Sequence, residues 1–128
     1  DESGIISGLD WKEDSQQFSY FITTAGGCYP DYMDSVIYKM DSNGKNKEEL
    51  VVEKKSRMDM IRWAPDGKEI VYSIYSGDCA DDEDLVSYIK AVNPKTKAIR
   101  EILSTRETEE SLNRKNPISI YFSSWVLK

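Results

Sequence analysis

Short runs of alternating apolar and polar residues, separated by polar turns, recur along most of the chain. In residues 69–74, Ile70, Tyr72 and Ile74 occupy alternate positions, and residues 17–23 show the same alternation. A period of two is typical of strands with one buried face. No stretch of ten or more residues has a convincing helical period. The pattern therefore predicts an all-β chain.

The strand-rich halves resemble each other at one fixed offset. Trp11 and Trp63 are 52 residues apart. The apolar or polar character of the side chain is also kept at this offset in several pairs: Asp14 with Asp66, Phe18 with Ile70, Tyr20 with Tyr72, Ile22 with Ile74, Ile37 with Ile89, and Leu50 with Ile102. A period near 50 residues is typical of repeat architectures. The repeat predicts that both tryptophans belong to the core.

Each unit is expected to contain four strands. The first unit has them at residues 9–11, 17–23, 36–40 and 49–53, and the second at 60–63, 69–74, 85–92 and 98–103. Ala64-Pro65-Asp66-Gly67 predicts a tight turn, since Pro presets φ and Gly permits positive φ. The corresponding turn of the first unit, 13–16, has neither Pro nor Gly.

One segment resembles a known family. Residues 61–73, which read Ile-Arg-Trp-Ala-Pro-Asp-Gly-Lys-Glu-Ile-Val-Tyr-Ser, are similar to the TolB-type β-propeller repeat, with Ala64 in place of the usual Ser. Residues 37–44 and 92–96 resemble that repeat's third strand and following turn. The resemblance implies two tandem four-stranded antiparallel sheets like propeller blades, in a partial propeller. The apolar residues of the tail, 118–127, predict a further C-terminal strand.

The expected organisation is a single domain over residues 1–128. Repeat one covers about 8–55, repeat two about 58–104, and a tail strand about 117–128. Propellers usually have about four to eight blades. Three arrangements stay open: a piece of a longer propeller, a ring completed by copies of this chain, or two sheets packed together with strands added by the tail.

Composition excludes several classes of function. The chain has no His and two Cys, which excludes Ser-His-Asp and Cys-His catalysis and four-thiolate zinc sites. Its net charge of −6 disfavours nucleic-acid binding. No apolar run is long enough to span a bilayer. The chain starts at Asp1, so a processed or excised protein is expected. No enzyme activity, cofactor or membrane insertion is expected of these residues.

The loops between second and third strands carry the candidate chemistry. Cys28 and Cys79 occupy similar places in the two loops, and either a disulfide or two free thiols would fit. Carboxylates gather in the second loop at Asp78, Asp81, Asp82 and Asp84, beside Glu83. Carboxylate oxygens suit calcium, but a solvated acidic loop is the preferred interpretation.

The same loops predict a recognition surface. Exposed aromatic and acidic side chains are typical of binding loops; the candidates are Tyr29, Asp31, Tyr32, Tyr75 and Asp78. We expect a non-catalytic binding or scaffolding domain for a protein or glycan. The alternative is an accessory propeller segment of an exported enzyme, such as a prolyl-oligopeptidase-like peptidase. The resemblance implies an extracytoplasmic location.

Overall fold

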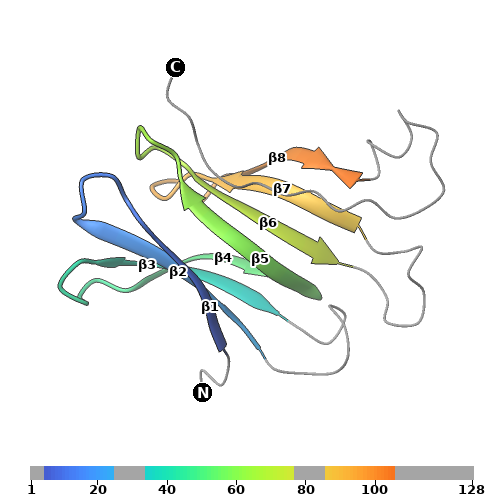
Figure 1. Cartoon of the computed structure of the whole chain (residues 1–128), viewed down its shortest axis with the longest axis horizontal. Helices are drawn as coiled ribbons and strands as arrows, with labels where there is room; N and C mark the ends of the chain where they lie inside the picture. The colour runs from blue at the N-terminus through green and yellow to red at the C-terminus, as the bar shows by residue number, and fades with distance from the viewer. Residues whose placement is uncertain (1–4, 25–33, 77–85, 106–128) are drawn as a thin grey trace.

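The computed structural model describes residues 5–24, 34–76 and 86–105, which form two four-stranded antiparallel sheets (Figure 1). The first sheet contains β1 (Ile5–Trp11), β2 (Gln17–Thr23), β3 (Ser35–Asp41) and β4 (Glu48–Glu53). The second contains β5 (Ser56–Trp63), β6 (Ile70–Ser76), β7 (Val86–Val92) and β8 (Ile99–Ser104). Neighbours in sequence are neighbours in each sheet.

The structure confirms the all-β prediction of two tandem four-stranded sheets. Their irregularities also repeat: the pairing of the first two strands shifts between Ile6 and Gly8 in one sheet and between Met58 and Met60 in the other. These shifts explain why β1 and β5 begin earlier than predicted, since a bulge interrupts the alternation used to find a strand. The tail strand predicted at 117–128 lies outside the described residues.

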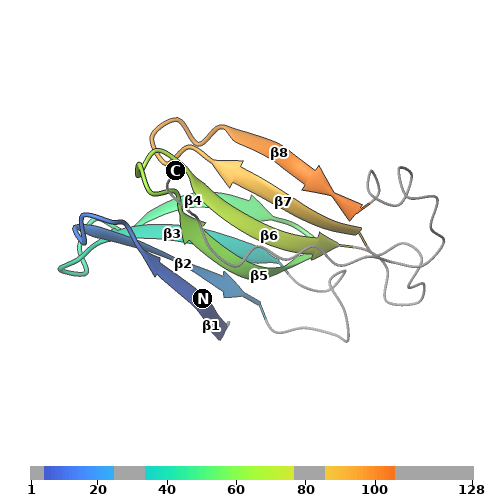
Figure 2. The ribbon, with the colours of Figure 1, turned by 45° about the horizontal axis from the view of Figure 1, so that its top comes forward.

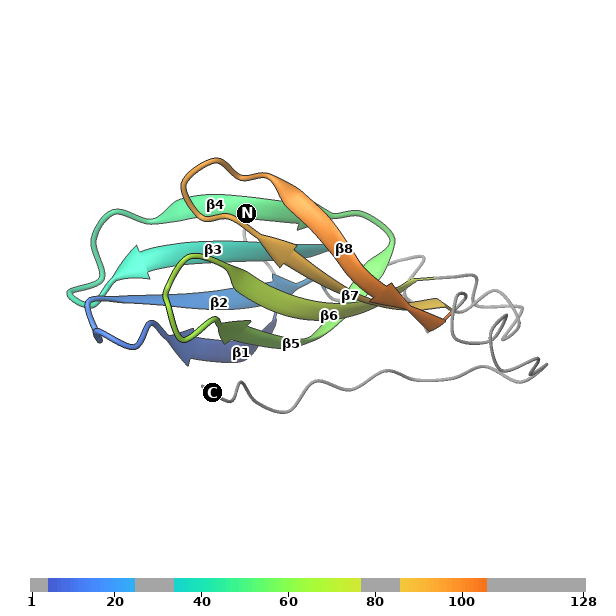
Figure 3. The same ribbon diagram turned by 90° about the horizontal axis from the view of Figure 1, so that it is seen from above.

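The two sheets stack face to face, with β5 against β1, β2 and β3. Figure 3 shows the first sheet behind the second, with the strands of both in the same order. The side of the first sheet that meets the second, its inner face, contributes Phe21, Ile37 and Val51 to the shared apolar core. Within the described ranges, no helix is long and apolar enough to cross a membrane.

The two tryptophans have different surroundings. Trp63 is buried in the shared core with 5% of its surface exposed, whereas 47% of Trp11 is exposed. The prediction that Trp11 belongs to the core is therefore wrong. Trp63 faces the first sheet, but Trp11 pairs with Phe18 on the side of the first sheet that points away from the second. No other described sheet covers that side.

The turns after β1 and β5 are equivalent despite their different sequences. Gly67 has φ of 70°, and Ser15, which stands 52 residues earlier, has φ of 58°. Asp66 accepts a hydrogen bond from the backbone N–H of Lys68, as Asp14 does from that of Gln16, both at 2.9 Å. The first unit therefore forms this turn without a glycine, at the cost of a left-handed serine.

Candidate binding site at the loop end of the sheets

Both predicted recognition loops leave from the same end of the stacked sheets. β2 and β6 run toward that end, where β3 and β7 begin (Figure 2). The connection from β4 to β5, Lys54-Lys55, crosses between the sheets there. The described residues thus bring both loop bases and this connection together.

The base of the first loop is fastened to the connection between the sheets. Asp34 accepts hydrogen bonds from Lys54 Nζ at 2.9 Å and from the backbone N–H of Lys55 at 3.1 Å. These bonds, the one from Lys54 first, hold the pKa of the Asp34 carboxyl below its usual range. The backbone N–H of Thr24 donates to the Asp34 carbonyl at 2.9 Å and closes the loop base.

A buried serine joins the sheets beneath this loop base. The Ser35 hydroxyl donates to the Ser56 carbonyl at 3.0 Å and accepts the backbone N–H of Met58 at 3.1 Å. Its contact with Thr23 Oγ1 at 2.9 Å is then donated by Thr23, because the Ser35 proton is already used. The hydroxyl of Ser35 is fully satisfied and fixes the end of β2 and β3 against β5.

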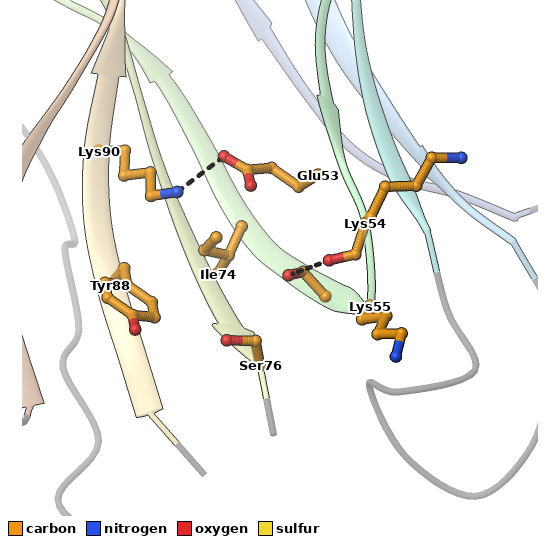
Figure 4. A pocket seen from close by; sticks show the side chains of 8 residues that line it. Glu53, Lys54, Lys55, Ile74, Ser76, Tyr88 and Lys90 are labelled. Carbon is orange, nitrogen blue, oxygen red and sulfur yellow. Dashed lines mark hydrogen bonds and ion pairs between the residues drawn. The ribbon is translucent and has the colours of Figure 1, made fainter. Parts of the chain in front are cut away.

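An open pocket of about 410 Å³ lies between the β4–β5 connection and the loop-end parts of β6 and β7. Figure 4 shows its walls, which come from the connection on one side and from β6 and β7 on the other. The lining residues are Glu53, Lys54, Lys55, Ser56, Ile74, Ser76, Tyr88 and Lys90. Figure 4 shows the Lys54 and Lys55 side chains directed away from Lys90 and Tyr88, so their ammonium groups belong to the rim. A mostly polar pocket with a basic rim suits a polar or acidic ligand group.

One wall of the pocket is built around the Glu53 carboxylate. Glu53 Oε1 accepts hydrogen bonds from Tyr72 Oη at 2.9 Å and from Lys90 Nζ at 3.1 Å, and Figure 4 shows the Lys90 ammonium directed at Glu53. Burial, and then the Glu53 charge, raise the pKa of Tyr72. Tyr72 therefore stays protonated and donates. The Glu53–Lys90 ion pair therefore gives this wall fixed polarity.

The predicted site residues fall mostly outside the described residues; these are Tyr29, Asp31, Tyr32, Asp78, Asp81, Asp82, Asp84, Cys28 and Cys79. Tyr75 is described, and its hydroxyl accepts a 2.9 Å hydrogen bond from Arg57 Nη1. It alternates with Ile74, so it lies on the opposite face of β6 from that pocket-lining residue.

Sequence reasoning missed the pocket itself. Lys54 and Lys55 form the connection between β4 and β5, a place that neither the strand pattern nor the repeat marks as a binding site. Glu53 and Lys90 are 37 residues apart in sequence. The repeat does not give their pairing, since the partner of Lys90 at the 52-residue offset is Tyr38.

No family model matches the chain, and no curated protein matches it in sequence. Solved structures do share its fold. The β-propeller domain of the Trilobed protease from Pyrococcus furiosus aligns over 80% of this chain and 28% of its own, with 19% identity and a TM-score of 0.54.

Two peptidases give similar alignments. Porphyromonas gingivalis dipeptidyl peptidase 4 aligns over 75% of this chain and 17% of its own, with 12% identity and a TM-score of 0.55. An acylaminoacyl peptidase aligns over 81% of this chain and 15% of its own, with 16% identity and a TM-score of 0.52. Identities this low establish the fold alone, that of an incomplete β-propeller whose two sheets are blades.

Proposed function

We propose that this chain is a non-catalytic binding domain that holds a polypeptide segment at the loop end of its two blades. The observation that carries the proposal is the open pocket beside the β4–β5 connection, whose lining includes Lys54, Lys55 and Lys90. Lys54 and Lys90 already pair with Asp34 and Glu53. Within the described ranges the Lys55 ammonium has no ion-pair partner and lies at the rim of the pocket (Figure 4), so it is the cation offered to a ligand carboxylate there.

The proposed surface includes residues of the two loops whose bases lie at this end. Tyr29 and Tyr32 belong to a loop whose base is fixed at Asp34, and aromatic side chains next to a lysine-rich pocket suit a peptide that carries both apolar and acidic residues. A protein ligand is favoured over a glycan because the Lys55 ammonium suits a carboxylate, and Tyr88 is the one aromatic side chain in the described lining. An extracytoplasmic location, with a Cys28–Cys79 disulfide tying the loops, belongs to the same proposal.

Peptide and glycan arrays probed with the purified domain test this function. Lys55→Glu and the Tyr29→Ala/Tyr32→Ala double variant are expected to reduce peptide capture by about tenfold or more, as loss of a charge-assisted contact near 1.4 kcal/mol implies. The matched control is Lys68→Glu, an exposed lysine in the turn at the other end of β6. Capture of glycans alone, or equal losses in the control, would contradict the proposal.

A second candidate function is an accessory propeller segment of an exported peptidase. It is favoured by the three structural neighbours, which come from a protease and two peptidases. In that case the catalytic residues lie in a partner domain or chain, because this chain has no His. Purification of the native protein followed by labelling with a serine-hydrolase fluorophosphonate probe separates the two. A labelled serine that copurifies with the domain favours this candidate, and its absence favours the binding domain.

A further inference from the structure

The first sheet has a broad apolar face that no described sheet covers. Residues opposite each other in an antiparallel pair share a face, so the pairing places Ile6, Leu9 and Trp11 of β1 beside Ile22, Tyr20 and Phe18 of β2. This outer face is opposite the one that meets the second sheet. Ile6, Leu9 and Trp11 are among the most exposed large apolar side chains of the described residues. Contiguous exposed apolar patches mark interaction surfaces.

The second sheet shows what such a face looks like when it is covered. The residues 52 positions after Ile6 and Leu9 are Met58 and Ile61. Exposure falls from 63% at Ile6 to 2% at Met58, and from 47% at Leu9 to 1% at Ile61. The covering surface is the inner face of the first sheet, with which Met58 and Ile61 share one core.

A polar contact between the first strands of the two sheets accompanies this stacking. The backbone N–H of Trp63 donates a 2.7 Å hydrogen bond to Oδ2 of Asp10, which lies on β1. Trp11 stands at the position equivalent to Trp63. A sheet that covers the outer face in the same way would therefore bring a carboxylate to the backbone of Trp11.

We propose that the outer face of the first sheet docks another four-stranded sheet of this repeat type. That partner presents apolar side chains at the places of Phe21 and Ile37, and an acidic residue at the place of Asp10. The resulting contact repeats the one between the two blades of this chain, and it buries Ile6, Leu9 and Trp11 as Met58, Ile61 and Trp63 are buried.

A second copy of this chain is a poor partner for the same surface. On its second sheet the residue equivalent to Asp10 is Arg62, which cannot accept a hydrogen bond, and the residue equivalent to Phe21 is Ser73. The inner face of its first sheet is already covered by its own second sheet. Charge and shape thus select a repeat unit that resembles the first unit of this chain.

An extended chain tests the proposal. Residues 1–55 are placed ahead of residues 4–128, so that Lys55 is followed by Gly4, the equivalent of Ser56. The added unit carries Trp11→Phe, so the Trp11 probed is the one in the full-length part. Hydroxyl-radical footprinting is expected to show Trp11 oxidation at least about fivefold slower than in the original chain, given exposed fractions of 47% at Trp11 and 5% at Trp63 and the usual effect of burial.

The matched control gives the added unit Asp10→Arg and Phe21→Ser, which copies Arg62 and Ser73 of the second sheet. This variant is expected to leave Trp11 nearly as reactive as in the original chain. Unchanged Trp11 oxidation in the extended chain would overturn the proposal. So would an added unit without hydrogen-exchange protection, because docking is what should fold it. A Trp11 protected by self-association of the original chain would overturn the choice of partner.

Discussion

The backbone N–H of Trp63 donates a 2.7 Å hydrogen bond to Oδ2 of Asp10, and this bond links the first strand of one blade to the first strand of the next. β5 pairs with β6 along one edge. At the end of the other edge of β5, the Asp10 carboxylate accepts the hydrogen bond from Trp63 N–H. A side chain of the first repeat thus takes the place that a neighbouring strand would have beside the second.

Asp10→Ala is expected to destabilise the chain by about 1–2 kcal/mol, because a partly buried N–H loses a charged acceptor. Asp10→Asn keeps an oxygen at this place, so it should cost less than Asp10→Ala. Urea unfolding followed by tryptophan fluorescence measures both. If Asp10→Ala unfolds at the same urea concentration as the unchanged protein, the bond does not contribute to stacking.

The turn after β1 contains a serine where its counterpart contains a glycine. Ser15→Gly is expected to raise the free energy of unfolding by about 0.5–1 kcal/mol, since only glycine adopts positive φ without a steric penalty. Gly67→Ser is the matched reverse change and should lower it by about 1 kcal/mol. Thermal unfolding of both variants checks the pair. Changes of the same sign at the two positions would show that the turns are not equivalent.

Tyr72 and Glu53 connect the blades at the wall of the pocket. Tyr72→Phe leaves the ring in place and removes the hydroxyl that donates to Glu53, so a loss of about 1–2 kcal/mol is expected. Tyr88→Phe is the control, since within the described ranges no hydrogen bond is recorded for that hydroxyl, and it should stay within about 0.5 kcal/mol. Equal losses of stability for Tyr72→Phe and Tyr88→Phe in chemical denaturation would show that this hydrogen bond does not stabilise the fold.

Acidic pH should weaken the hydrogen bonds that Asp34 accepts at the base of the first loop. The pKa of Asp34 is lowered in the folded state, first by Lys54 and then by the backbone N–H of Lys55. Its contribution is therefore present above the unfolded value of 3.8 and is lost as the pH falls through the lower folded value.

Asp34→Asn tests that contribution. The variant should be less stable than the unchanged protein at pH 6, by less than about 1 kcal/mol because the pair is partly exposed. The gap should close as the pH drops below the unfolded value. Unfolding free energies measured from pH 6 to acid check this, and a gap that widens in acid would contradict it.

The strand pattern and the 52-residue repeat were sufficient to predict both sheets from sequence. The repeat gave the wrong burial for Trp11, because equivalent residues of two units are equally buried only when a neighbouring sheet covers both. Periodicity carries no information about which unit has a neighbouring sheet against a given face. Trp63 has the first sheet beside it, and Trp11 has no described sheet.

The candidate site was only partly predictable. The strand pattern placed both predicted recognition loops between second and third strands, and strand direction then put their bases together. The pocket depends on contacts between repeats, such as Glu53 with Lys90, which pair residues at non-equivalent positions. An internal repeat predicts the features that its units share. It cannot reveal contacts that form only where one sheet packs against the next.

The two blades are equivalent sheets stacked in one direction, so the tryptophan at the same repeat position is buried in the second blade and exposed in the first. Comparison of Trp63→Ala with Trp11→Ala in equilibrium unfolding tests this most directly. We expect a loss of about 3–5 kcal/mol for Trp63→Ala and less than about 1 kcal/mol for Trp11→Ala. Equal losses at the two positions would contradict the account.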